Sequence, residues 1–460
     1  NQEENYVWAE DCYGKTIEDG ESEDAGEVIQ AGIDYVAGKG GGKVVIREGN
    51  YDIKSTISWK DNVEVRGHGI DRTILNYYDD IEVFSADGLT NISLKDLTIN
   101  GHYTGETAGN NHTVHIKNSS QIIIDSVKIL NTRVFAVHLW LCSDFLVNRL
   151  LVESSLIHRD GIKASGGQNG VISNCIIKSG DDCISVTGIN REAKNIAIVN
   201  NILTSDYASG IKLVVSDVTP YPIHDIVVAN NSIYETDSVG INVTAEGDAD
   251  IYSITISDNN VRNPGMRRNN TTGTAAGIQI KGTSAKYARF ITISGNTVLF
   301  DGISGTPLAR GILTFFAREI TVKGNVVRVN QTTTSDSRGI QIGDTGKPTK
   351  YFTVSGNVID MGGQGECCIG IIRSSHGSVN DNICLNAGRA GIRIAGDSDN
   401  PCYHIALVGN RCRDETNTQE YGILSEGTSD YLVVTGNDTE GNLTSGISLV
   451  GTNNVIGDNI

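Results

Sequence analysis

The chain has 460 residues and a formal charge of −18, from 37 basic and 55 acidic side chains. This charge argues against a nucleic-acid partner, because binding a phosphate backbone requires a basic surface. No apolar run approaches the roughly 20 residues that a membrane-spanning helix needs. Glycine is abundant (53 residues) and proline is rare (6), and the turn-forming residues are spread evenly instead of being gathered into linkers.

The N-terminal part predicts a cap. Residues 21–37 are typical of an amphipathic helix. Its apolar positions share one stripe: Val28, Ile29, Ile33 and Val36. A glycine-rich turn at 38–42 and a strand at 43–46 follow. Such a helix would cover the core and the unpaired strand edge at one end of a repeat protein, so we expect an N-terminal cap over residues 1–60.

From about residue 160 one sequence motif recurs, with a period of about 28 residues. It consists of an alternating apolar strand, an asparagine-containing turn, a variable loop and a Gly-Ile pair that opens the next strand. Asparagine tolerates left-handed backbone, which is expected at these bends. The turn asparagines are Asn174, Asn201, Asn231, Asn259, Asn296, Asn325, Asn357, Asn382, Asn410 and Asn437.

This repeat predicts an all-β, right-handed parallel β-helix of about a dozen coils over residues 61–460, as one architectural domain. A single coil cannot bury its Ile and Val side chains, but coils stacked about 4.8 Å apart form continuous ladders of like residues. A βαβ protein would need helices of about 10 to 15 residues between strands, and none are visible. A β-sandwich would not repeat one sequence motif with a period of about 28 residues.

The chain contains nine cysteines, an odd number, so at least one cannot pair within the chain. Their spacing does not resemble a metal site, and no metal is predicted. Burial as small apolar side chains and disulfide formation both remain open for each cysteine, and burial is favoured.

Two successive coils break the pattern just before the strand opens. The segments are 158–162 (HRDGI) and 179–184 (SGDDCI), where other coils have a small or apolar residue. Aligning their isoleucines places Asp160 and Asp182 in one column, with Asp181 beside them. Carboxylates stacked about 5 Å apart repel each other and titrate together. A glycosidase needs such a cluster to protonate the leaving oxygen and to activate water. The alternative is a solvated bend, with or without a bound cation.

Residues 112–215 resemble the polygalacturonases and related pectin-backbone hydrolases of glycoside hydrolase family 28. The stretch 135–142 (FAVHLWLC) is similar to the family's aromatic, Val-His-Leu and Cys segment. Residues 158–161 resemble its Asn-Thr-Asp-Gly motif, and residues 180–183 match its Gly-Asp-Asp-Cys motif one coil later.

The resemblance implies that Asp181 is the general acid and that Asp160 and Asp182 position and deprotonate the attacking water, with inversion at the anomeric carbon. Two family motifs are missing. The Gly-His-Gly motif falls at 208–210 without its histidine, and the Arg-Ile-Lys uronate clamp falls at 242–244 without a positive charge. Polygalacturonate specificity is therefore in doubt, whereas the hydrolytic carboxylates are present.

Six further side chains are predicted to bind substrate: His158, Lys163, Ser185, Tyr207, Lys212 and Tyr234. Lys163, Ser185 and Lys212 follow the aligned isoleucines of successive coils and are expected to project outward. Tyrosines in loops can stack on sugar faces. Solvated lysines and ordinary loop tyrosines are the alternative.

The sequence thus predicts an extracellular or cell-surface hydrolase of a pectin-like or other acidic or deoxyhexose-containing polysaccharide, working without a cofactor. The chain carries no recognisable secretory signal peptide. One alternative is a lyase or C5-epimerase whose aspartates bind Ca²⁺, with Lys212 as its base. Another is a non-catalytic adhesin, tailspike-like or surface-layer module. The oligomeric state is open.

Overall fold

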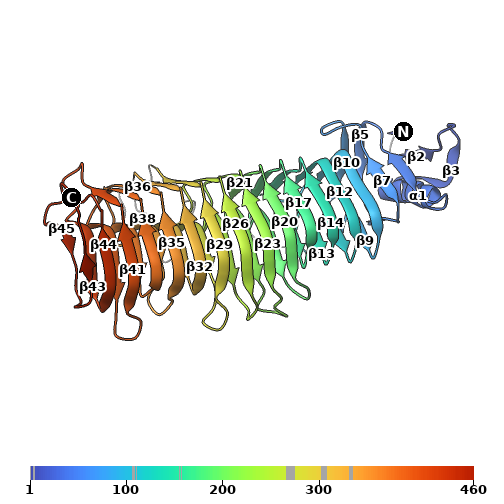
Figure 1. Cartoon of the computed structure of the whole chain (residues 1–460). Coiled ribbons are helices and arrows are strands. Elements are labelled where there is room, and N and C mark those ends of the chain that lie inside the picture. The colour runs from blue at the N-terminus through green and yellow to red at the C-terminus, as the bar shows by residue number, and fades with distance from the viewer. Residues whose placement is uncertain are drawn as a thin grey trace. The chain divides into compact units, whose positions relative to one another are not determined.

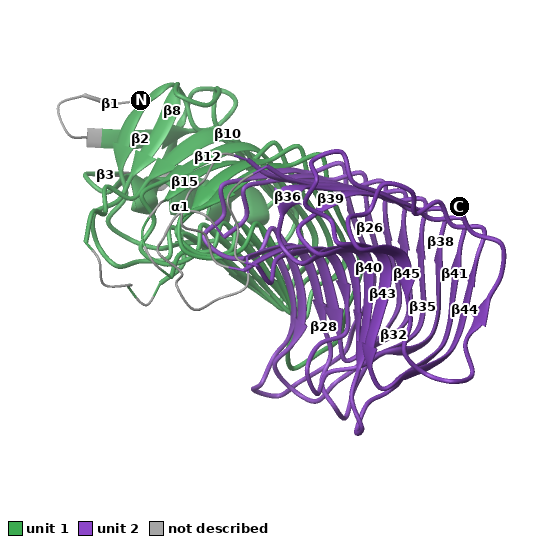
Figure 2. Cartoon of the chain, turned by 90° about the vertical axis from the view of Figure 1, so that its left-hand side faces the viewer, with its two compact units in different colours: residues 1–211 green, residues 212–460 purple. Residues whose placement is uncertain are grey.

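The computed structural model describes residues 2–3, 6–105, 109, 111–154, 156, 158–265, 275–301, 308–330 and 335–460. The fold is an all-β parallel β-solenoid of about 13 turns with one short helix, which confirms the predicted fold class. The chain divides into two compact units, residues 1–211 and 212–460 (Figure 2). The boundary between a cap and one β-helical domain stays a prediction.

The N-terminal end of the first unit combines a small sheet with the helix (Figure 1). Strands β1 (Gln2–Glu3), β2 (Tyr6–Glu10) and β3 (Thr16–Ser22) pair antiparallel, and α1 (Ala25–Ala37) follows. The helix begins four residues later than predicted, because Asp24 caps it by accepting a hydrogen bond from the Gly26 N–H at 2.8 Å. Among the described residues, no helix is long and apolar enough to cross a membrane.

The rest of the first unit consists of parallel strands wound in coils. The strands are β4 (Gly42–Val45), β5 (Gly49–Asp52), β6 (Ile57–Ser58), β7 (Val63–Arg66), β8 (Thr73–Asn76), β9 (Phe84–Asp87), β10 (Thr90–Asn100), β11 (Val114–Lys117), β12 (Ser120–Leu130), β13 (Val137–Trp140), β14 (Ser143–Asn148), β15 (Leu151–Ser154), β16 (Ile162–Ser165), β17 (Gln168–Ser173), β18 (Ile176–Ser179), β19 (Ile184–Gly188), β20 (Ala193–Val199) and β21 (Ile202–Ser205).

One sheet of this unit bears on function. It has the strand order β6-β9-β11-β13-β16-β19, so each strand pairs with its counterpart one coil away. The register aligns Ile162 with Ile184. The inward side chains, such as Val137, Leu139 and Ile162, are fully buried and form the core of the coils.

The second unit repeats the same winding. Its strands are β22 (Ile211–Val215), which begins at the boundary, β23 (Ile223–Ala229), β24 (Ser232–Tyr234), β25 (Ile241–Ala245), β26 (Ile251–Ser257), β27 (Asn260–Arg262), β28 (Ala275–Lys281), β29 (Ala288–Ser294), β30 (Thr297–Phe300), β31 (Ala309–Phe315), β32 (Ala317–Lys323), β33 (Val326–Val329), β34 (Arg338–Ile342), β35 (Thr349–Ser355), β36 (Val358–Gln364), β37 (Cys367–Ile372), β38 (Ser375–Asn380), β39 (Ile383–Ala387), β40 (Ala390–Gly396), β41 (Cys402–Val408), β42 (Arg411–Arg413), β43 (Tyr421–Gly427), β44 (Ser429–Thr435), β45 (Ser445–Ser448) and β46 (Val455–Ile456).

A ladder of buried asparagines stabilises the turns of the second unit. The Oδ1 of Asn296 accepts hydrogen bonds from the backbone N–H and the side-chain amide of Asn259, at 3.0 and 2.9 Å. Its own amide donates to the carbonyl of Ile256 at 3.0 Å and to the Oδ1 of Asn325 at 2.9 Å. The same contacts continue coil by coil through Asn357, Asn382, Asn410 and Asn437 to Asn459.

The expectation of left-handed backbone holds for Asn174 but is wrong for the nine turn asparagines that follow it. The left-handed residue precedes each ladder position, for example Asp258 at φ 57° and Gly295 at φ 67°. Asn174 is such a preceding residue, at φ 57°, and the next position is occupied by Cys175, whose N–H donates to the Asn201 side chain. The ladder position is conformationally ordinary, and it selects asparagine because the buried amide can both donate and accept.

The cysteines settle the alternative that the sequence left open. All nine are free, eight of them are buried, and only Cys12 is exposed. Cys384 and Cys412 lie in register on successive coils. They therefore act as small apolar core residues.

Replacing Asn296 by alanine should remove one ladder position. The Asn259 N–H and the Ile256 carbonyl would stay buried without their partner, which costs about 1–3 kcal/mol for each such group. Thermal and urea unfolding of Asn296→Ala should show a clear loss of stability. The matched control is Asn330→Ala at an exposed position. Equal stability of the two variants would contradict the proposed role of the ladder.

Candidate active site

The three predicted aspartates lie in two loops that precede neighbouring strands of one sheet. Asp160 lies between β15 and β16, and Asp181 and Asp182 lie between β18 and β19. The Gly161 N–H donates to the Asp182 carbonyl at 3.1 Å, and the Asp181 N–H donates to the Arg159 carbonyl at 3.0 Å. These main-chain bonds hold the two loops together.

The loop that carries Asp181 and Asp182 is held from several sides. The hydroxyl groups of Ser179 and Ser205 both donate to the Asp181 carbonyl at 2.7 Å. Gly180 permits the close approach of the preceding coil, because a Cβ there would lie 1.7 Å from the carbonyl oxygen of Leu156. Burial raises the pKa of the Cys183 thiol to about 12, so this thiol is protonated and packs as a core residue.

The carboxylates of Asp160, Asp181 and Asp182 converge. One oxygen from each lies within 4.8 Å of the other two. Asp160 and Asp182 are 3% and 6% exposed, whereas the side chain of Asp181 is 31% exposed. The ammonium group of Lys163 lies 3.2 Å from Asp160, and the Ser209 N–H donates to Asp182 at 3.0 Å. Like charges at this separation repel strongly when they are shielded from water.

The other predicted substrate contacts of the first unit differ in position. His158 is largely exposed, with its Nδ1 3.9 Å from an Asp181 oxygen. Lys163 lies beside the carboxylates, and Tyr207 is half-buried in the loop before Ser209. Ser185 is 1% exposed and pairs in register with Lys163. Ser185 shares the outward face of the sheet with Lys163, but its short side chain is covered, whereas the longer lysine reaches the carboxylates.

Two predicted contacts belong to the second unit. Lys212 on β22 forms an ion pair with Glu246 at 3.0 Å, and Tyr234 at the end of β24 is exposed. The position of these two side chains relative to the carboxylates stays a prediction.

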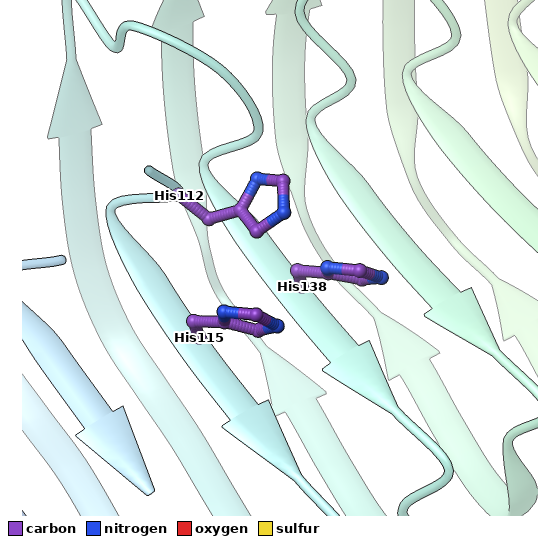
Figure 3. A group of neighbouring side chains, drawn as sticks. All are labelled: His112, His115 and His138. Carbon is purple, nitrogen blue, oxygen red and sulfur yellow. The ribbon is translucent and has the colours of Figure 1, made fainter. Parts of the chain in front are cut away.

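A histidine cluster that the sequence analysis did not single out lies on the same sheet. His115 on β11 and His138 on β13 pair in register, and His138 pairs with Lys163 on the next coil. The rings of His115 and His138 lie parallel, with their centroids 4.9 Å apart, and His112 lies across them (Figure 3). A usable signal was present, because Val-His-aliphatic recurs at 114–116 and 137–139, one coil apart.

The electrostatics of this cluster keep two of its rings neutral. Burial, together with neighbouring histidines, lowers the pKa of His112 to about 4 and that of His138 to about 2. The Nδ1 of His115 lies 2.5 Å from a carboxylate oxygen of Glu82. Burial opposes ionisation of Glu82, but hydrogen bonds from Ser85 and His115 lower its pKa overall.

The chain is similar to known proteins both in sequence and in structure. Residues 16–242 match the family model described as rhamnogalacturonase A/epimerase, pectate lyase-like, which covers just under half of the chain. A family 28 exopolygalacturonase of Yersinia enterocolitica is similar in structure, with a TM-score of 0.53 at 14% identity over 90% of this chain and 76% of that one. The chain has the pectin-lyase-like β-helix fold. This confirms the recognition made from the sequence.

Proteins with other roles share this pectin-lyase-like fold. The tailspike protein of E. coli bacteriophage HK620, solved in complex with a pentasaccharide, has a TM-score of 0.58 at 15% identity, with 91% and 77% of the two chains covered. The surface adhesin PfbA of Streptococcus pneumoniae has a TM-score of 0.50 at 14% identity, with 89% and 90% covered. At these identities the likeness concerns the fold alone, so the carboxylates must carry the functional argument.

One hollow of the first unit lies away from the aspartates. This cavity of about 600 Å³ lies between α1 and its neighbouring strands and is lined by residues such as Trp8, Tyr35 and Val45. It is formed by the junction of the helix with the first coils.

Gly180→Ala should destabilise the loop that carries Asp181 and Asp182. The new Cβ would overlap a backbone carbonyl that cannot rotate away, so we expect a loss of about 1–3 kcal/mol or more. Thermal unfolding of the variant and of the unmodified protein measures this loss of stability. The control is Gly32→Ala in α1, whose nearest neighbour would lie at an ordinary 3.4 Å. A Gly180→Ala protein as stable as Gly32→Ala would contradict the loop geometry.

Proposed function

We propose that this protein hydrolyses glycosidic bonds in a polysaccharide, with Asp160, Asp181 and Asp182 as its reactive groups. The observation that carries the proposal is the convergence of three carboxylates within 4.8 Å, two of them nearly buried. Their mutual repulsion destabilises the fold, so a purely structural role does not account for them. Carboxylates brought this close together are found preferentially where chemistry is done.

The geometry supports a division of roles among the three aspartates. Asp181 is the most exposed of the three and is best placed to deliver a proton to the leaving glycosidic oxygen. Asp160 and Asp182 are shielded from solvent and accept hydrogen bonds from Lys163 and the Ser209 N–H, which favours their ionised forms. As carboxylates they can orient a water molecule and take its proton as it attacks the anomeric carbon.

The substrate proposed is a pectin-like polysaccharide, or another glycan that contains acidic or deoxyhexose sugars. The matching family is described by rhamnogalacturonase A, which favours this class. Lys163 provides a cationic group beside the carboxylates, and His158 provides an exposed imidazole. An extracellular or cell-surface location follows from such a substrate.

The stereochemical outcome is a separate question. Family resemblance favours inversion, whereas carboxyl groups in inverting enzymes are typically about 6.5–9.5 Å apart. The spacing here is at most 4.8 Å between the nearest oxygens. Proton NMR of the first product released reports directly which anomer forms.

The test is digestion of a panel of pectic and other acidic polysaccharides, with release of reducing ends as the readout. The unmodified protein should release reducing ends from at least one member. Asp181→Asn should lower the rate by about 10²–10⁴-fold, since it removes the proton donor. The control is Asp144→Asn, an exposed aspartate of the same unit. Equal rates for Asp181→Asn and the unmodified protein would refute the proposal.

A second candidate is a Ca²⁺-dependent lyase or C5-epimerase on the same residues. Two observations favour keeping it: the matching family includes epimerases in its description, and the three carboxylates can supply the oxygen ligands that Ca²⁺ prefers. A lyase would give an unsaturated product that absorbs in the ultraviolet, and chelation would abolish its activity. Hydrolysis gives no such absorbance and should survive the chelator.

A further inference from the structure

We propose that His112, His115 and His138 form a binding site for a divalent transition-metal ion of the zinc class. One ring nitrogen from each histidine lies within 4.8 Å of the other two, and the three residues come from neighbouring turns of the first unit (Figure 3). Neutral imidazole is a preferred ligand of Zn²⁺, Cu²⁺ and Ni²⁺. The site is distinct from the three aspartates and from their proposed chemistry.

Two ring nitrogens point to a missing partner. The Nδ1 atoms of His112 and His138 are buried and have no hydrogen-bond partner in the described part of the chain. His138 as a whole is 6% exposed, and its other nitrogen is engaged by the Ser165 hydroxyl at 3.1 Å. A buried polar atom without a partner costs free energy, and a bound cation would remove that cost at both rings.

The third ring has the contact that metal-binding histidines usually make. The Nδ1 of His115 is held by the Glu82 carboxylate at 2.5 Å, which leaves its Nε2 available to an ion. A carboxylate that hydrogen-bonds the far nitrogen orients the ring and increases its basicity. Glu82 also supplies a negative charge close to the three ring ligands.

Lys163 is a neighbouring cation that opposes a metal ion, but its ion pair with Asp160 offsets part of its charge. The ammonium group of Lys163 lies 4.7 Å from the Phe135 ring centroid and is paired with Asp160. His112 stacks on Phe135 at a centroid distance of 4.6 Å. Tetrahedral zinc–imidazole bonds of about 2.0–2.1 Å bring ligand nitrogens to about 3.3 Å apart. The contraction from the present spacing is on the order of 1 Å, within reach of rotation about the broad χ2 torsion of histidine.

The experiment is titration of the full chain, first treated with a chelator, with Zn²⁺ by calorimetry and with Co²⁺ by absorption spectroscopy. We expect one ion per chain and a Co²⁺ spectrum with d–d bands but no sulfur charge-transfer band. His138→Ala should weaken binding by at least about tenfold, and Glu82→Gln should weaken it by about 10–100-fold, since it removes only the orienting carboxylate. Excess Ca²⁺ should not compete.

The matched control is His376→Ala, which alters a histidine of the second unit whose ring centroid lies 5.2 Å from that of another histidine. It should bind Zn²⁺ like the unmodified protein. Binding that is unchanged in both His138→Ala and Glu82→Gln would overturn the proposal, as would a sulfur charge-transfer band, which assigns the ion to cysteine. Glu82→Gln keeps the test decisive if His138→Ala does not fold. Because the readout is binding, failure here is separate from failure of glycan hydrolysis.

Discussion

The structure depends on the parallel register between coils, which places equivalent positions of successive turns side by side. Residues about one coil apart in sequence thereby become neighbours in space. One such column runs through His115, His138, Lys163 and Ser185 of the first unit. The carboxylates of Asp160 and Asp182 are brought together in the same way, just before the strands of that sheet begin.

Stacking like residues has different consequences for different chemistry. Aliphatic ladders bury apolar surface at no electrostatic cost. Asparagine ladders work because each amide donates and accepts, so Asn259 donates to Asn296, which donates in turn to Asn325. Carboxylates have no such complementarity, and Lys163 and the Ser209 N–H offset only part of their repulsion. Imidazoles can lose their charge instead. The first unit thus combines an acidic cluster with a histidine cluster in which the pKa values of His112 and His138 are lowered.

The sequence predicted the features that depend on the repeat and missed those that depend on local detail. The winding and the alignment of Ile162 with Ile184 follow from periodicity, and that alignment was sufficient to bring the aspartates together. The start of α1 was missed because capping by Asp24 decides it. The burial of Ser185 depends on the length of its neighbour Lys163. His112 lies outside a strand, so its contact with His138 depends on the path of a loop that no period describes.

The central claim is that register makes the three aspartates act as one catalytic unit. A double-mutant cycle tests it directly. It compares the kcat values of the unmodified protein, Asp160→Asn, Asp181→Asn and the double variant on a polysaccharide that the panel identifies as a substrate. Groups that act as a unit give grossly non-additive effects, so the double variant should be about as slow as the slower single variant. Effects on kcat that multiply as for independent residues would contradict the account.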